Sequence, residues 1–309
     1  MDKLLSASVV PPRFRNSALL TGHVPHKSLA SEPRVSYALY VPEKIYNQRH
    51  PDVGEPGPNK LPLLVAVHGT RRDVFNVYDL VPFAESTPCA ILLPLFPIGL
   101  DGPNDVDSYK LLKSKTLRPD LALLSILDEV AIKWPAIETN KIFLMGFSGG
   151  GQFSHRFLYL YPERLAAVSI GAPGRTTSLD EEKSWPSGIK DAEEIFGRTI
   201  NKELIKKVPI HLIVGDQDTS LHGDGEFWAW VKQYTGKAGG EDTPVNNEHG
   251  VQMIEQGRLK TTHELQDSWK ALGIESQFDI VPGVAHNARG VRSLVLQYLQ
   301  PLIRKQDGK

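Results

Sequence analysis

Ser148 lies at the centre of a glycine-rich segment, Gly-Phe-Ser-Gly-Gly-Gly at residues 146–151, which follows an apolar run at 141–145 and precedes a helical pattern beginning near Gln152. A serine in Gly-x-Ser-x-Gly between a strand and a helix must occupy a strained turn that projects its hydroxyl from the sheet edge, and a Cβ on the flanking glycines would collide with neighbouring elements. This pattern predicts that Ser148 is a nucleophile. Because the pattern is short, a glycine-rich turn with an ordinary serine is the alternative.

A serine hydroxyl becomes a strong nucleophile only when an imidazole takes its proton and a carboxylate orients that imidazole. Residues of both kinds follow Ser148, each in a loop after a predicted strand: Asp216 and Asp218 after the run at 208–215, and His286 after the run at 276–281. The chain order is therefore Ser, Asp, His. The two aspartates are two residues apart in what is expected to be a turn, so the alternation of side chains along a strand does not decide between them.

Apolar runs of strand length alternate with segments of helical spacing along the chain. The strand-like runs are at 17–25, 34–42, 61–69, 90–96, 141–145, 165–171, 208–215 and 276–281, and helical spacing is found at 120–134, 152–161 and 288–304. The first two runs alternate in polarity and predict an antiparallel pair, whereas the later ones are almost continuously apolar, as in strands buried on both faces. The sequence predicts an α/β fold with a doubly wound, mostly parallel central sheet that binds ligands at the carboxyl ends of its strands.

Two intervals between these elements are too long to be plain connections. Residues 172–207 predict a cap over the site, and residues 219–257 predict a second insertion. Three aromatic side chains in these intervals, Trp185, Trp228 and Trp230, could line an acyl or aromatic pocket, with packing as the alternative for each. No repeat or interdomain linker divides the sequence, so we expect residues 1–309 to form a single domain with cap-like insertions.

The motifs and their order resemble the α/β-hydrolase family, over roughly residues 35 to 304. The resemblance is strongest at His68-Gly69, at the Ser148 segment, at the Gly-x-x-Asp segment and at the final histidine. It implies that Ser148 is the nucleophile, His286 the general base and then acid, and Asp218 the residue that orients His286. Asp218 is favoured over Asp216 because the family places its acid three residues after the glycine.

The negative charge that develops on a carbonyl oxygen during attack needs preorganised hydrogen-bond donors. One donor is expected to be the backbone N–H of Gly149, next to the nucleophile and at a helix start whose dipole favours negative charge. The resemblance places the second donor at Thr70, directly after His68-Gly69, where an ordinary turn residue is the alternative. Arg71 follows and could bind a substrate carboxylate, with an ion pair to Asp73 or to the cap as the alternative.

Composition disfavours several classes of function. Lys and Arg number 35 and Asp and Glu 36, so a net charge of -1 gives no basic surplus for binding nucleic acid. No apolar run of about 18 residues predicts a membrane span, and the start of the sequence lacks the pattern of an export signal. Cys89 is the only cysteine, and no histidine pair has zinc-ligand spacing. We therefore expect a cytoplasmic enzyme without disulfide, metal or cofactor.

Together these features predict a serine hydrolase that cleaves a carboxylic ester or thioester of a small organic molecule through an acyl-enzyme. The chain resembles the esterase branch of the family that includes feruloyl esterases and polyhydroxybutyrate depolymerases, but without their export signal and disulfides, which argues against a polymer or cell-wall substrate. An intracellular metabolic or biosynthetic ester fits better. Two alternatives are a lyase or cyclase in which His286 acts as a base without hydrolysis, and a ligand-binding protein, although binding members often lose a triad residue and all three candidates are present here.

Overall fold

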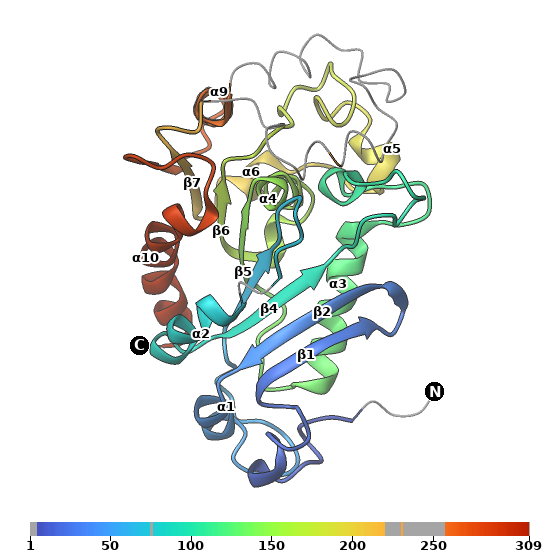
Figure 1. Ribbon diagram of the computed structural model, residues 1–309, viewed down its shortest axis with the longest axis vertical. Coiled ribbons are helices and arrows are strands. Elements are labelled where there is room, and N and C mark those ends of the chain that lie inside the picture. Colours follow the sequence, from blue (N-terminus) through green and yellow to red (C-terminus); the bar gives the residue numbers. More distant parts are fainter. Residues whose placement is uncertain (1–4, 75–76, 220–229, 231–256, 309) are drawn as a thin grey trace.

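The computed structural model describes residues 5–74, 77–219, 230 and 257–308, and in this part of the chain the strands form an eight-stranded sheet (Figure 1). The strands are β1 (Gly22–Leu29), β2 (Glu32–Val41), β3 (Leu63–Val67), β4 (Ala90–Leu95), β5 (Ile142–Phe147), β6 (Leu165–Gly171), β7 (Ile210–Gly215) and β8 (Gln277–Val281). Their order across the sheet is β1-β2-β4-β3-β5-β6-β7-β8. The pairs β1-β2 and β2-β4 are antiparallel and the remaining neighbours are parallel, so the carboxyl ends of β3, β5, β6, β7 and β8 meet at one edge.

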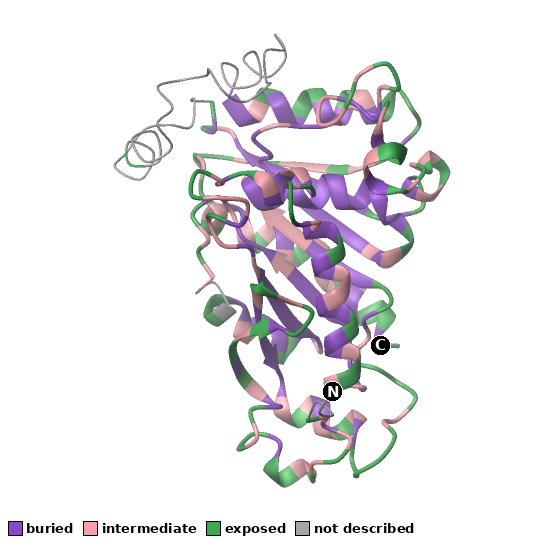
Figure 2. Cartoon of the chain, turned by 90° about the vertical axis from the view of Figure 1, so that its right-hand side faces the viewer, coloured by how far each residue is buried: buried purple, intermediate pink, exposed green. Residues whose placement is uncertain are grey.

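Helices cover both faces of this sheet and build a hydrophobic core on each. On one face the apolar side chains of α3 (Pro119–Lys133), α4 (Gly149–Leu160) and α9 (Gly257–Lys270) pack against the sheet, and on the other face α2 (Val77–Ser86) and α10 (Ala288–Gln306) do so. The central strands are buried on both sides, which explains why their sequences are continuously apolar (Figure 2). The remaining helices are α1 (Glu43–Arg49), α5 (Ala192–Phe196) and α6 (Lys202–Ile205).

The predicted fold class, a doubly wound and mostly parallel sheet, is confirmed by this architecture. The predicted strands agree with the observed ones except at the first, where the run at 17–25 begins too early and β1 starts only at Gly22. The chain bends before this point because Leu19 has a φ of 54° and the carbonyl of Leu20 accepts a hydrogen bond from the indole of Trp134 (2.7 Å). Local alternation of polarity did not reveal this bend.

The first insertion, residues 172–207, contains α5 and α6 and contributes to the core, since Phe196 and Ile205 are buried in the cluster on the α4 face. Of the second insertion, residues 219–257, only residues 219, 230 and 257 are described. Four of the described helices were not anticipated from the sequence, namely α1, α2, α6 and α9.

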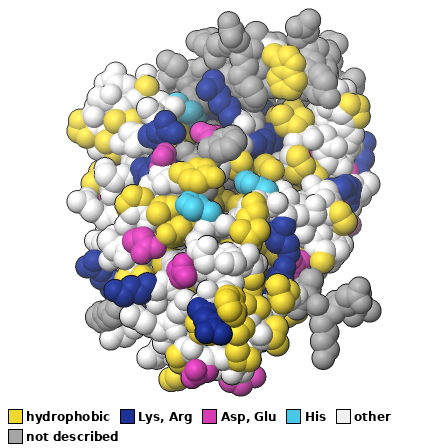
Figure 3. All heavy atoms as spheres, turned by 60° about the horizontal axis from the view of Figure 1, so that its bottom comes forward, with side chains coloured by type: hydrophobic (Ala, Val, Ile, Leu, Met, Phe, Trp, Pro, Cys, Tyr) yellow, Lys and Arg dark blue, Asp and Glu magenta, His cyan; other side chains and the backbone are white. Residues whose placement is uncertain are grey.

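Two features of the described residues bear on the class of protein. No helix among them is long and apolar enough to span a membrane. They also contain no group of three or more His, Cys, Asp and Glu side chains that could hold a metal ion. On the face shown in Figure 3, basic and acidic side chains are interspersed among hydrophobic and histidine side chains, without a broad field of one charge.

Candidate active site

Ser148 occupies the turn between β5 and α4, with φ 58° and ψ −114°. This left-handed conformation is costly for a residue with a Cβ, and the surrounding structure holds it in place. The Ser148 N–H donates to the carbonyl of Gly171 at the end of β6 (2.9 Å). A Cβ at Gly146 would collide with the Gly150 carbonyl, and one at Gly150 would collide with the Val67 carbonyl, so α4 packs this closely against β5 and β3 only with these glycines.

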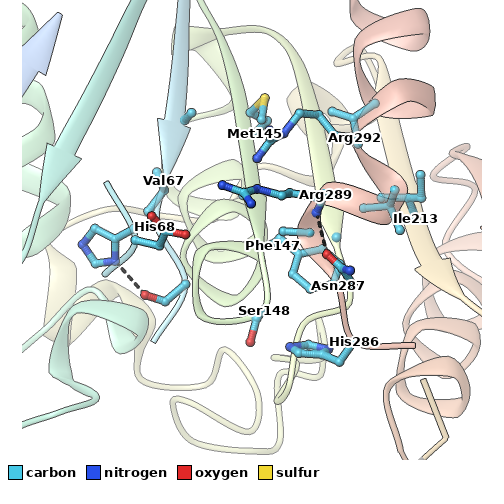
Figure 4. Close-up of a pocket in the computed structure, with 18 of the residues that line it drawn as sticks. Val67, His68, Met145, Phe147, Ser148, Ile213, His286, Asn287, Arg289 and Arg292 are labelled. Carbon is cyan, nitrogen blue, oxygen red and sulfur yellow. Dashed lines mark hydrogen bonds between the residues drawn. The ribbon is translucent and has the colours of Figure 1, made fainter. Parts of the chain in front are cut away.

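Asp218 and His286 come together across the carboxyl ends of β7 and β8. The Nδ1 of His286 donates to the Oδ2 of Asp218 at 2.6 Å, and Asp218 is only 2% exposed. Figure 4 shows the His286 ring beside the Ser148 side chain. Asp216, the alternative acid, instead accepts a hydrogen bond from the Gly283 N–H (2.8 Å) and so braces the turn that precedes His286. The structure therefore pairs His286 with Asp218 and gives Asp216 a separate contact.

The surroundings of His286 favour its neutral form. Burial lowers the pKa of His286, and the nearby cations Arg258 and Arg71 lower it further, while the hydrogen bond and the negative charge of Asp218 raise it in part. The ring also packs against Phe147, with 4.7 Å between the ring centres. In a neutral imidazole whose Nδ1–H is bonded to a carboxylate, Nε2 is the ring atom that accepts a proton.

Thr70 and Gly149 lie next to each other beside Ser148. A Cβ built on Gly149 would lie 3.1 Å from the backbone nitrogen of Thr70, and Gly149 is the first residue of α4. The Gly149 amide is thus at the helix N-terminus that follows the serine, where the helix dipole favours negative charge, and the Thr70 amide nitrogen lies beside it. The arrangement suits a pair of donors for an oxyanion.

Two side chains fix the loop that contains Thr70. His68 donates from Nδ1 to the Gly69 carbonyl (2.9 Å) and accepts from the Phe96 N–H at Nε2 (3.0 Å), which binds the loop to the end of β4. Burial lowers the pKa of His68 to about 3, so this ring stays neutral. Arg72 donates to the carbonyls of Phe96, Thr70 and Val106, at 3.0, 2.6 and 2.6 Å. These hydrogen bonds give His68 a local structural role, and the role of Arg72 was not anticipated from the sequence.

Ser148, Asp218 and His286 line one cavity of about 610 Å³. In Figure 4 the cavity extends from Ser148 and His286 past Phe147 to Met145 and Arg292. Its wall between the sheet and the helices α2 and α10 is mainly apolar, with Leu80, Leu93, Met145, Ile213, Val291 and Val295. Arg289 and Arg292 also line it, and both donate to the carboxylate of Asp79 (3.2 and 2.6 Å). The cavity is therefore shaped for an apolar group of moderate size with polar groups at its border.

Of the residues predicted to line the substrate pocket, some line this cavity and others do not. Arg71 is among the residues that line the cavity. Trp185 does not: its indole donates to the Leu111 carbonyl (2.9 Å) and its ring packs against Phe196 (4.8 Å between ring centres), so the packing alternative holds for it. Trp230 is 45% exposed, and Trp228 lies outside the described residues.

The start of α9 supports the acid, and nothing in the sequence analysis suggested it. The backbone N–H groups of Arg258 and Leu259 both donate to the Asp218 carbonyl, at 2.9 and 3.0 Å. Gly257 precedes them with a φ of 71°, and a Cβ there would lie 2.5 Å from the backbone of Thr219. The helix start therefore packs directly on the Asp218 loop. In sequence, a glycine before a polar helix does not indicate that the helix supports the acid. The contact of Gly257 with Thr219 is seen only in the structure.

No protein-family model and no curated protein sequence matches the chain. Its structure is similar to that of poly(aspartic acid) hydrolase-1 from Sphingomonas sp. KT-1, with a TM-score of 0.64 and 17% identity over 90% of this chain and 98% of that one.

Two further solved structures are similar over nearly the whole chain. For the poly(3-hydroxybutyrate) depolymerase from Bordetella parapertussis the TM-score is 0.61 and the identity 20%, over 93% of each chain. For an S-formylglutathione hydrolase from Agrobacterium tumefaciens the TM-score is 0.56 and the identity 13%, over 93% of this chain and 100% of that one. The strand order, the two helical layers and these similarities show that the chain has the α/β-hydrolase fold.

Proposed function

We propose that the protein is a serine hydrolase that cleaves a carboxylic ester or thioester of a small organic molecule through an acyl-enzyme. The observation that supports this most strongly is the convergence of a strained Ser148, a neutral His286 and a buried Asp218 at one end of one cavity. The similar solved structures include a depolymerase and an S-formylglutathione hydrolase, whose names describe ester and thioester cleavage by those proteins.

In the proposed first step the Ser148 Oγ attacks the carbonyl carbon of the substrate, and its proton moves to Nε2 of His286. Asp218 holds the opposite ring nitrogen and stabilises the imidazolium that forms. The N–H groups of Thr70 and Gly149 donate to the carbonyl oxygen as it becomes negative. The bond to the leaving alcohol or thiol then breaks, and that group takes the proton from His286.

In the second step a water molecule gives a proton to His286 and attacks the acyl-enzyme carbonyl. The tetrahedral intermediate again places its negative oxygen against Thr70 and Gly149, and its collapse breaks the bond to Ser148, whose Oγ recovers the proton. The apolar wall beside Ser148 suits an acyl group of moderate size, and the cavity volume of about 610 Å³ sets its upper limit.

A fluorophosphonate probe tests the proposal, because it reacts with serines activated by this arrangement. We expect labelling at Ser148 in the wild type and none in Ser148→Ala, together with a loss of ester turnover on the order of 10⁴-fold or more. Ser154→Ala is the matched control, since Ser154 is a buried serine on α4 that does not line the cavity. Equal labelling or turnover in Ser148→Ala would sink the assignment.

A further inference from the structure

A hydrogen-bonded series of Ser, His and Asp, separate from the proposed catalytic residues, crosses three neighbouring strands. The Oγ of Ser169 on β6 lies 2.9 Å from Nδ1 of His211 on β7, and Nε2 of His211 lies 3.0 Å from Oδ2 of Asp279 on β8. Ser169 and His211 are register partners in the parallel sheet, so their side chains emerge on the same face. The sequence analysis had no reason to connect these residues, and the proposed catalytic steps do not use them.

The direction of each hydrogen bond follows from Asp279, the acid at one end of this Ser–His–Asp series. The Asp279 carboxylate can only accept, so Nε2 of His211 has the hydrogen and its Nδ1 is an acceptor. His211 is 0% exposed and stacks on Tyr298 at 4.6 Å, and burial lowers its pKa against the opposing charge of Asp279. The Ser169 hydroxyl therefore donates its hydrogen to His211. Its oxygen keeps lone pairs for another partner.

Ser169 is also part of the wall of the proposed active-site cavity. Its register partner on β5 is Met145, and Ile213 is on the adjacent strand β7; both side chains also line the cavity and offer no comparable hydrogen-bond acceptor. It precedes Gly171, whose carbonyl binds the Ser148 N–H, by two residues. Two residues of strand correspond to about 7 Å, so Ser169 lies farther from the carboxyl end of β6 than the residue that binds the Ser148 backbone.

We propose that Ser169 is a specificity-determining residue that accepts a hydrogen bond from a hydroxyl or N–H group on the acyl part of the substrate, at a distance from the reacting carbonyl. His211 and Asp279 are positioning residues that hold Ser169 as an acceptor. The inference rests on the proposed function, because the acyl group must be bound to Ser148 for its far end to reach Ser169.

A purely structural role does not account well for the hydrogen-bonded residues Ser169, His211 and Asp279. Burying a serine and a histidine costs free energy that apolar residues at the same places would avoid, and the bond to Asp279 only offsets it. A fixed acceptor in a mainly apolar wall, by contrast, discriminates between acyl groups with and without a hydrogen-bond donor. It binds a donor-bearing acyl group and leaves an unpaired polar atom against an acyl group that lacks the donor.

The test uses pairs of p-nitrophenyl esters with straight acyl chains of equal length, one with a terminal hydroxyl and one without. At the matching chain length, we expect kcat/KM of the wild type to favour the hydroxyacyl ester by roughly tenfold, as one net hydrogen bond provides. In Ser169→Ala the ratio should fall to about one, through a loss on the hydroxyacyl ester alone. Ser154→Ala, a buried serine outside the cavity, should keep the wild-type ratio.

His211→Phe tests the positioning role while keeping a ring against Tyr298. Without its acceptor, the Ser169 hydroxyl can turn its hydrogen into the cavity, so the preference should move from hydroxyacyl toward oxoacyl esters. An equal kcat/KM for both members of every pair in the wild type, or an unchanged ratio in Ser169→Ala, overturns the inference even if the enzyme hydrolyses esters. Failure of the fluorophosphonate probe to label Ser148 overturns the proposed function, and the inference with it.

Discussion

At the scale of single residues, two energetically unfavourable features of the site support the proposed chemistry. Ser148 is held at a φ of 58°, and His286 is kept neutral although a carboxylate lies 2.6 Å from it. Both features arise from packing: glycines let β3 and α4 approach the turn, and burial of His286 opposes the charge of Asp218. The nucleophile candidate and its base are therefore prepared before a substrate arrives.

Mutation should distinguish Asp218 from Asp216 by the size of the loss in activity. Asp218→Asn removes the negative charge that stabilises the imidazolium, so we expect kcat/KM to fall on the order of 10³- to 10⁴-fold. Because Asp218 raises the pKa of His286, the remaining activity should also rise with pH through a lower midpoint than in the wild type. In Asp216→Asn an oxygen remains to accept from Gly283, so this control should lose little. The reverse ranking would make Asp216 the acid.

At the scale of elements, the start of α9 positions the acid. Its first backbone amides hold the Asp218 carbonyl, and Gly257 allows the helix to begin directly against Thr219. The loop of the acid is also joined to the loop of the base, because the Gln217 N–H donates to the Val284 carbonyl (3.0 Å). Errors in the placement of α9 would therefore reach the Asp218–His286 pair.

Gly257→Ala should reveal this support. The new Cβ would lie 2.5 Å from the backbone of Thr219 at a φ of 71°, so we expect a loss of about 1–3 kcal/mol in the free energy of unfolding and at least tenfold in kcat. Gly273→Ala is a matched control, because its φ is 70° and the nearest atom would be 3.8 Å away. Urea unfolding and ester kinetics of both variants measure these losses. Equal losses in both variants would mean that the positive φ, and not the contact with Thr219, causes them.

Sequence patterns predicted the elements whose apolar residues are continuous, which is why β3 to β8 were located closely. They missed α9 because its polar sequence has few apolar positions, of which Leu265 and Trp269 face the core. They missed the start of β1 because the bend depends on Trp134, far along the chain.

The site shows the same division between local and distant information. Ser148 and His286 stand in motifs that local sequence displays, and so could be nominated without a structure. The chain Ser169, His211 and Asp279 could not be, because it depends on which strands are neighbours in the sheet. Strand order results from packing between distant segments, so no local pattern encodes it.

At the scale of the whole molecule, several buried histidines make the fold sensitive to acid. Burial lowers the pKa of His68, His155, His211 and His286 in the folded state. Below a pH of about 6.5 the unfolded chain therefore binds more protons than the folded one, so stability falls as the pH falls. For His68, whose folded pKa is about 3, the loss between pH 6.5 and 4 is on the order of 3 kcal/mol.

Urea unfolding between pH 7 and pH 4 measures this effect. The free energy of unfolding should fall steadily over this range in the wild type and less steeply in His68→Gln, which has no group to protonate. His263→Gln is the control, since His263 is an exposed histidine. A slope in His68→Gln as steep as in the wild type would contradict the assignment of His68.

The contact between Thr219 and Gly257 has a consequence for how such a protein can change over time. It joins two points of the backbone that are distant in sequence, and a shift at either one acts on Asp218, whose carbonyl accepts from the amides that follow Gly257. Selection on the proposed acid therefore extends to a glycine that has no part in the proposed catalytic steps.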